Sequence, residues 1–117
     1  MTTWYVDGAG WNNLVCKTCV MQENGEPNVT VFTEKKTNNE CEYGALLEAL
    51  ELAQEKDTIY SDSQMMVNHL NGQYRVRAQH LKPLFLRAKE LIREKKVTLL
   101  WLRREENLAG KHLEKLE

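Results

Sequence analysis

The spacing of apolar residues changes once along this chain, near Glu40, and that change constrains the fold more than any other feature. Before Glu40, segments rich in β-branched and aromatic residues alternate with turn signals, which predicts strands at residues 3–6, 14–22 and 28–34. The loop between the last two contains Asn24-Gly25, a strong hairpin signal. We therefore expect these three strands to form an antiparallel meander.

After Glu40, apolar residues recur every three or four positions, as in a helix with one buried face. We expect helices from residue 40, over 61–70, over 81–92 and after Asn107, and strands at 58–60 and 97–102. Asn38 or Asn39 can cap the first helix, and Asn107 the last. A strand, a helix and a strand in succession imply a parallel crossover. The predicted fold is α/β, a five-stranded mixed sheet of three antiparallel strands and two parallel additions, flanked by helices.

The chain has 117 residues, of which 42% are hydrophobic, enough to bury one core but not two. We expect one domain over residues 1–117. No apolar run approaches the roughly 18–20 residues that cross a bilayer, and the first residues lack the layout of a secretory signal. We therefore expect a cytoplasmic monomer with no membrane partner. The odd number of cysteines favours reduced thiols, and Cys16 and Cys19 should point to opposite faces of a strand.

Three acidic residues occupy positions that solvent exposure alone does not explain. Asp7 ends the first predicted strand just before glycines, Asp62 ends the fourth, and Glu42 lies in the first turn of the intervening helix. Ligands of open α/β sheets bind at such strand ends, where three converging carboxylates would need a cation, preferably Mg²⁺ or Mn²⁺. Each acid could instead serve a turn, a cap or a helix dipole. The other acids are expected on solvated faces, including Glu48, Glu51 and Glu55.

Three segments of the chain resemble the signature segments of type 1 ribonuclease H. They are Tyr5-Val6-Asp7-Gly8-Ala9, Thr37-Asn38-Asn39-Glu40-Cys41-Glu42 and Tyr60-Ser61-Asp62-Ser63-Gln64. Their order and spacing agree with that family, and the resemblance continues through residues 70–76 and 101–107. The predicted order of strands and helices is also that of the ribonuclease H fold. Any one segment is weakly specific, but all of them in register are strongly specific.

The resemblance implies an endoribonuclease that hydrolyses the RNA strand of RNA/DNA hybrids. It implies that Asp7, Glu42 and Asp62 hold two Mg²⁺ or Mn²⁺ ions at the scissile phosphate. It also implies contacts with the hybrid, from residues that resemble those touching the RNA strand (Asn39 and Gln64) or a DNA phosphate (Asn12 and Thr37), with Asn38 among them. Turn and capping chemistry is the alternative explanation for these short polar residues.

The chain departs from the family at the fourth active-site position. The family has an Asp four residues after the Asn of the last segment, where this chain has Lys111, which cannot bind a cation. Asn107 is the preferred replacement as catalytic and metal-binding residue, because its amide oxygen is a neutral, hard ligand at a helix start. Glu114 is the second candidate. Asn107 could also be a plain N-cap, in which case neither residue replaces the missing carboxylate.

Two further departures from the family concern the binding of nucleic acid. The family's mobile loop histidine has no counterpart between Trp101 and Asn107, and the stretch that forms a basic protrusion in many bacterial members has only Arg75, Arg77 and Lys82. With a formal net charge of -1, the chain should bind modestly and lose affinity steeply with salt.

The alternative function is a catalytically weak or inactive module of the same fold that binds a hybrid or another nucleic acid. A pure binder, however, would not need three acids that repel one another. A nuclease of the same fold for duplex RNA or a DNA junction is a further alternative, and the resemblance at Thr37, Asn38, Asn39 and Gln64 favours the hybrid over it.

Overall fold

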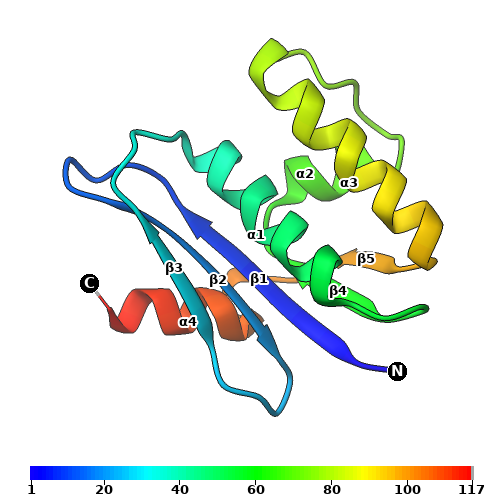
Figure 1. Ribbon diagram of the computed structural model, residues 1–117, viewed down its shortest axis with the longest axis horizontal. Coiled ribbons are helices and arrows are strands. Elements are labelled where there is room, and N and C mark those ends of the chain that lie inside the picture. Colours follow the sequence, from blue (N-terminus) through cyan, green and yellow to red (C-terminus); the bar gives the residue numbers. More distant parts are fainter. Residues whose placement is uncertain (117) are drawn as a thin grey trace.

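The computed structural model of the protein describes residues 1–116, as a five-stranded sheet with helices on both faces (Figure 1). The strands are β1 (Thr3–Ala9), β2 (Cys16–Gln22), β3 (Asn28–Phe32), β4 (Thr58–Ser61) and β5 (Thr98–Trp101). The helices are α1 (Asn38–Leu52), α2 (Gln64–Leu70), α3 (Lys82–Lys95) and α4 (Leu108–Lys115), and two 3₁₀ turns, η1 and η2, span Gln79–Leu81 and Arg104–Glu106. The predicted order of elements is confirmed.

The sheet has the strand order β3-β2-β1-β4-β5, with β1 at its centre. The first three strands pair antiparallel, as the hairpin signal between β2 and β3 predicts. β4 joins β1 in parallel and β5 joins β4 in parallel, because a helix returns the chain across the sheet before each of them. The mixed sheet expected from the sequence is therefore confirmed.

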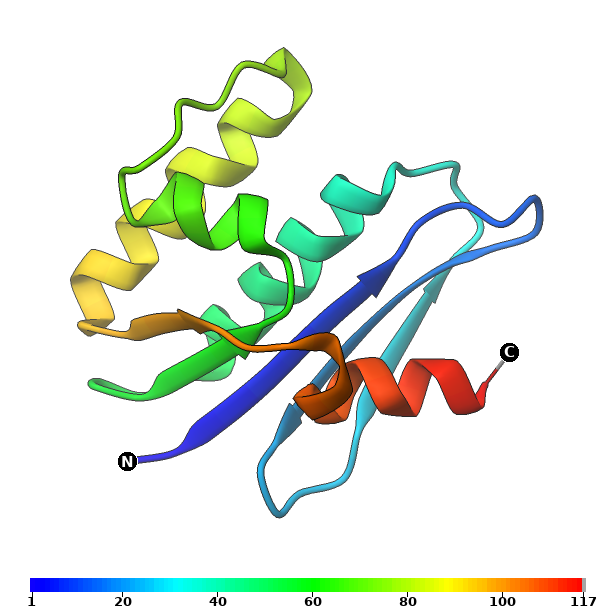
Figure 2. The ribbon, with the colours of Figure 1, turned by 180° about the vertical axis from the view of Figure 1, so that it is seen from behind.

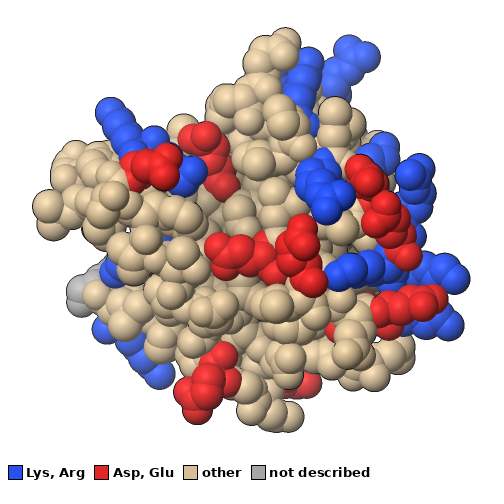
Figure 3. Space-filling view, in the orientation of Figure 1, with Lys and Arg blue, Asp and Glu red and all other residues tan. Residues whose placement is uncertain are grey.

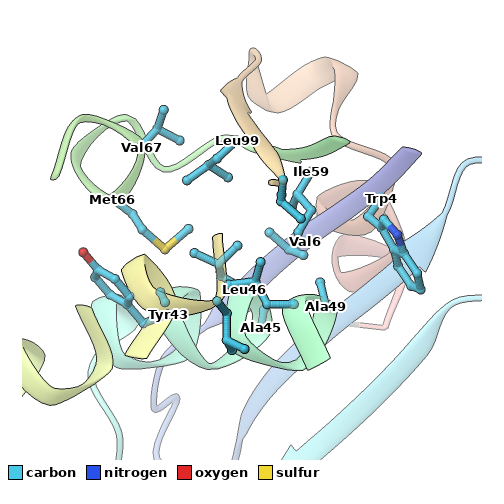
Figure 4. Close-up of a cluster of buried hydrophobic side chains, with 14 of the residues drawn as sticks. Trp4, Val6, Tyr43, Ala45, Leu46, Ala49, Ile59, Met66, Val67 and Leu99 are labelled. Carbon is cyan, nitrogen blue, oxygen red and sulfur yellow. The ribbon is translucent and has the colours of Figure 1, made fainter. Parts of the chain in front are cut away.

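The helices cover the two faces of the sheet unequally. α1 and α3 pack against each other with α2 on one face, whereas α4 lies across β1 and β2 on the other (Figures 1 and 2). The main core fills the space between α1 and the sheet, where Leu46 and Ala49 meet Val6, Ile59 and neighbouring side chains (Figure 4). None of the helices within residues 1–116 has the length and apolar character needed to cross a membrane.

The alternation of side chains along β1 sets up the functional site. Trp4 and Val6 belong to the core under α1, whereas Tyr5 and Ala9 pack in the smaller cluster beneath α4. Asp7 shares the parity of the second pair, so its carboxylate points to the face that α4 covers.

Two predicted boundaries near the site were wrong. β1 continues to Ala9 instead of ending at Val6, because Asp7 and Gly8 are paired with Cys19 and Thr18 of β2. The residues after Tyr60 were expected to begin a helix, but Ser61 is the last residue of β4, and α2 starts only at Gln64.

The predicted cap of α1 was also wrong. Thr37, rather than Asn38 or Asn39, caps the helix. Its Oγ1 accepts the Glu40 N–H at 3.1 Å, and Glu40 Oε1 accepts the Thr37 N–H at 2.8 Å. This reciprocal capping box satisfies two backbone donors at once, which a single Asn cap does not.

Glu48 was expected on the solvated face of α1 but is turned toward β2. The Thr18 hydroxyl donates to Glu48 Oε1 at 2.9 Å, and burial raises the pKa of Glu48. The reason is that α1 lies between the sheet and α3, which leaves it a narrower exposed face than a helix on the rim would have. Glu51 and Glu55 are exposed as expected and pair with Arg87 and Lys96. Figure 3 shows acidic and basic side chains interspersed over this side of the molecule.

The two cysteines of β2 diverge as predicted from strand alternation. Cys19 packs with Ala109 and Leu113 of α4, whereas the Cys16 thiol donates to the Glu34 carbonyl at 2.9 Å. Cys16, Cys19 and Cys41 are all free and buried in the described structure.

Candidate active site

The three predicted acids converge from three different elements. Asp7 comes from β1, Glu42 from the first turns of α1, and Asp62 directly follows β4. One carboxylate oxygen from each lies within 4.8 Å of those of the other two. Asp7 and Glu42 are only 2% and 4% exposed, so this cluster lies inside the fold rather than on a solvated surface.

A close contact between β1 and α1 brings Glu42 beside Asp7. A Cβ atom on Gly8 would lie 2.5 Å from both the carbonyl oxygen of Cys41 and the backbone nitrogen of Glu42. Only a residue without a side chain therefore lets the first turns of α1 rest directly on the strand. Gly8, which a sequence interpretation treats as a turn residue, thus sets the distance between two acids of the site.

Asp62 is fixed by the end of β4 and by β5. Pairing between β1 and β4 stops at Val6 and Ser61, so the chain leaves the sheet just where the Asp62 side chain begins. The Trp101 indole N–H donates to the Asp62 carbonyl at 3.1 Å, which ties this backbone to the end of β5.

The three close carboxylates repel one another and are costly to ionise at this depth. Asp7 Oδ1 and Glu42 Oε2 are buried and have no hydrogen-bond partner among the described residues. Burial, followed by the neighbouring carboxylates, raises the pKa of Glu42 to about 10. Burial and Asp62 likewise raise the pKa of Asp7 to about 6. Two orphaned oxygens among three close carboxylates are what a site for a multivalent cation requires.

Asn107 presents its amide nitrogen to the acids. Its Nδ2 donates to the Val6 carbonyl at 2.9 Å and to Asp62 Oδ2 at 3.0 Å, while its Oδ1 accepts the Ala109 N–H at 3.1 Å. The oxygen that was predicted to bind metal is thus used to cap α4. In this geometry Asn107 positions Asp62 and begins the helix, and ligation through its oxygen would require the amide to turn and give up these hydrogen bonds.

The residue of α4 that lies against the acids is a glycine. A Cβ atom on Gly110 would lie 3.3 Å from Asp7 Oδ2 and 3.4 Å from Asp62 Oδ2. Lys111 is exposed, and Glu114, the second candidate for the fourth ligand, instead pairs with Arg104 at 3.2 Å. Gly110 therefore contributes only backbone next to two of the acids.

Sequence reasoning missed two residues at this site. Gly110 could have been found, because it lies three residues after Asn107 and so shares its helical face. Arg104, whose Nη1 lies 3.9 Å from Asp62 Oδ2, carries no such signal. It stands next to Arg103 in a charged run, and nothing local distinguishes the arginine that faces the acids from the one that faces solvent.

The residues predicted to contact nucleic acid lie in the loop after β1 and around the starts of α1 and α2. Asn38 Oδ1 accepts the Gly10 N–H at 3.1 Å, so the loop after β1 is tied to the start of α1. Asn12 Oδ1 holds a turn by accepting the N–H groups of Leu14 and Val15. A hollow of about 670 Å³ beside them is lined by Gly10, Trp11, Asn13, Lys35, Lys36, Thr37 and Asn38.

The remaining predicted contacts are more scattered. Asn39 is half-buried in the first turn of α1, and Gln64 is exposed at the first position of α2, two residues after Asp62. Farther away, a second hollow of about 670 Å³ separates the loop after α2 from α3. Its basic lining includes the three residues noted in the sequence and one more from α3, namely Arg75, Arg77, Lys82 and Lys89.

The raised pKa of Glu42 predicts how stability depends on pH without metal. Between the ordinary value of 4.5 and about 10, the folded protein retains a proton that the unfolded chain releases. The free energy of unfolding should therefore fall as pH rises through this window, and Asp7 adds to the fall between 3.8 and about 6. Thermal melts in EDTA from pH 5 to 9 should show a decreasing Tm, with a shallower slope for Glu42→Gln. Equal slopes for the two proteins would contradict the assignment.

Comparison with known proteins agrees with this geometry. The family model for RNase H matches residues 1–110. The chain is similar to RNase H1 from the halophilic archaeon Halobacterium salinarum NRC-1, with 24% identity over 96% of this chain and 92% of that one and a TM-score of 0.78. It is also similar to LC11-RNase H1, isolated from compost by a metagenomic approach, with 25% identity over 96% and 91% and a TM-score of 0.80.

LC11-RNase H1 also matches in a structure of its complex with an RNA/DNA hybrid, with 23% identity over 97% of this chain and 93% of that one and a TM-score of 0.75. The match of the family model over nearly the whole chain, together with the fold and the converging acids, decides the family. The chain belongs to the type 1 ribonuclease H family of metal-dependent ribonucleases.

Proposed function

We propose that the protein hydrolyses the RNA strand of RNA/DNA hybrids, using two divalent ions held by Asp7, Glu42 and Asp62. The observation that carries this proposal is the convergence of three carboxylates, two of them buried, with unpartnered oxygens in a chain of the ribonuclease H family. One domain over residues 1–117, a monomeric state and a cytoplasmic location accompany the proposal as predictions.

The donor set fits Mg²⁺ or Mn²⁺. All three side chains offer hard carboxylate oxygens, which these ions prefer over nitrogen or sulfur ligands. Asp7 Oδ1 and Glu42 Oε2 have no other partner among the described residues, and a cation would neutralise the carboxylates whose burial, followed by mutual repulsion, raises both pKa values. When bound, divalent ions supply Lewis-acid chemistry that acidifies an attacking water and stabilises the leaving 3′ oxygen.

The protein's own residues would bind the divalent ions and hold the three acids in position. Asp7 and Glu42 hold their carboxylates rigidly because β1 and α1 touch at Gly8. Asp62 is held by Asn107 Nδ2 at 3.0 Å and, through its carbonyl, by the Trp101 indole at 3.1 Å. We propose that Asn107 serves the reaction through Asp62, as a positioning residue, and that α4 supplies no fourth carboxylate.

Recognition of the hybrid is proposed for the polar residues beside the cluster. Asn39 and Gln64 are assigned to the RNA strand, where the 2′-hydroxyl distinguishes RNA from DNA. Asn12 and Thr37 are assigned to a phosphate of the DNA strand, since the adjoining hollow, which Asn38 also lines, carries Lys35 and Lys36.

A second candidate function is a hybrid-binding module with weak or no cleavage. Two observations favour it: Gly110 rather than a carboxylate adjoins Asp7 and Asp62, and the Arg104 guanidinium lies 3.9 Å from Asp62. Both lower the negative charge available to divalent ions.

The two candidates differ in the fate of a labelled RNA strand. We would incubate the protein with an end-labelled RNA/DNA hybrid, single-stranded RNA, duplex RNA and duplex DNA, each with Mg²⁺, with Mn²⁺ and with EDTA. Cleavage is expected only in the hybrid, only with metal, and with an efficiency that falls steeply between about 50 and 200 mM salt. Retardation of the hybrid in a gel without cleavage under either metal would instead establish the binding module.

A further inference from the structure

Arg104 places a positive charge at the edge of the carboxylate cluster. It begins the 3₁₀ turn that leads into α4, and its Nη1 lies 3.9 Å from Asp62 Oδ2. Its Nε donates to Glu114 Oε1 at 3.2 Å, so the same guanidinium lies between an acid of the site and an acid of α4. The side chain is 59% exposed, whereas Asp62 is only 8% exposed, so Arg104 is the partner that can move.

The charge of Arg104 acts on Asp7 as well as on Asp62. Its field favours the ionised form of Asp7, which counteracts part of the effect of burial on the pKa of that residue. A cation that neutralises Asp62 also reduces the attraction of the cluster for any other cation, because both depend on the same negative charge. The effect is large here because α4 brings Gly110, and no carboxylate of its own, against these acids.

We propose that Arg104 is a resident counter-cation of the carboxylate cluster, which competes with divalent ions for Asp62 and is held back by Glu114. The proposal rests on the metal site put forward above and adds how that site is regulated. With Arg104 near Asp62, the metal-free protein is stabilised. With Arg104 held by Glu114, the acids are available to metal. The affinity of the site for divalent ions therefore depends on how strongly Arg104 pairs with Asp62 and how strongly it pairs with Glu114.

The first test measures metal binding without nucleic acid, by titration calorimetry with Mn²⁺. Arg104→Gln should tighten binding about tenfold, the size expected for a unit charge and a divalent ion roughly 5 Å apart in a solvated site. Arg103→Gln is the matched control, because it removes the same charge from the adjacent residue, which pairs with Glu106 and not with the site. The metal-free Tm of Arg104→Gln should also fall, since the acids lose their counter-charge.

Glu114 is tested by a double-mutant cycle. Glu114→Gln should weaken Mn²⁺ binding several-fold, because Arg104 then has only Asp62 to pair with. If Glu114 acts through Arg104, most of that loss disappears in the Arg104→Gln background. Equal losses in both backgrounds would mean that Glu114 acts as an independent charge, and would overturn its assigned role.

The outcomes separate this inference from the proposed function. Failure of the wild-type protein to bind Mn²⁺ would overturn the metal site and the inference with it. Binding by the wild type with unchanged affinity in Arg104→Gln, or with the same change in Arg103→Gln, would leave the metal site intact and overturn the role of Arg104. Tighter binding in Arg104→Gln alone supports the proposal.

Discussion

Replacing Asp7 by Asn is expected to lower cleavage of the hybrid's RNA strand by about 10³-fold or more, since divalent ions contribute several kcal/mol of charge stabilisation in such reactions. Asp7 is 2% exposed, and its Oδ1 has no partner within the described residues, so this oxygen is free to bind a cation. The same change should raise the metal-free Tm by a few degrees, because it removes one of three repelling carboxylates. Rates with saturating Mn²⁺ and melts in EDTA measure both effects.

The matched control is Asp57→Asn, which alters an acid that is equally buried but has a structural role. Asp57 accepts hydrogen bonds from the backbone N–H groups of Thr2 and Gln54 and from the Trp4 indole. Its loss should lower the Tm while leaving the cleavage rate per folded molecule unchanged. Asp7→Asn should thus raise the Tm, whereas Asp57→Asn should lower it. Cleavage by Asp7→Asn at close to the wild-type rate would exclude Asp7 from the reaction.

Gly8→Ala should destabilise the protein by about 3 kcal/mol, at the upper end of the cost of overpacking a core. The new methyl group would lie 2.5 Å from the backbone nitrogen of Glu42, and backbone cannot rotate away as a side chain can. α1 would have to lift from β1, so Glu42 would move away from Asp7. We therefore expect a lower Tm, together with weaker Mn²⁺ binding in the fraction that remains folded.

The same substitution at Gly44 should stabilise the protein, whereas at Gly8 it should destabilise it. Gly44 lies inside α1, and a methyl group there would meet only Thr18 Cγ2, at an ordinary contact distance of 3.8 Å. Alanine is favoured over glycine in a helix interior by about 0.8–1 kcal/mol, so the Tm should rise. Urea or thermal denaturation of both variants measures the two changes in stability. Equal destabilisation by the two substitutions would show that the contact at Gly8 is not special.

The order of strands and helices could be predicted because it follows from local periodicity. Alternation before Glu40 and three- to four-residue spacing after it reflect which face of each element is buried, and the hairpin signal at Asn24-Gly25 sets the antiparallel start. Element ends were less predictable. β1 extends through Gly8 because β2 supplies hydrogen bonds there, and a partner strand is not a local property of the sequence.

The three acids could also be identified, because Asp7, Glu42 and Asp62 belong to recognisable segments and were expected at strand ends or in the first turn of a helix. The orientation of the side chains around these acids could not be predicted from the sequence. Asn107 was expected to offer its oxygen, but Val6 and Asp62 both present acceptors to it, so the amide nitrogen faces them. That choice depends on Val6, 101 positions away in the sequence, and on Asp62, 45 positions away.

The sequence by itself determined the family, the layout of the sheet and the identity of the clustered acids, since these follow from short-range spacing and from segments in register. The tertiary structure alone decided that Gly8 is a contact between backbones, that Glu48 faces β2, that Gly110 adjoins the acids and that Arg104 lies between Asp62 and Glu114. The physical reason is that rotation and depth of a helix on a sheet depend on the packing of distant segments, whereas periodicity records only that a face is buried.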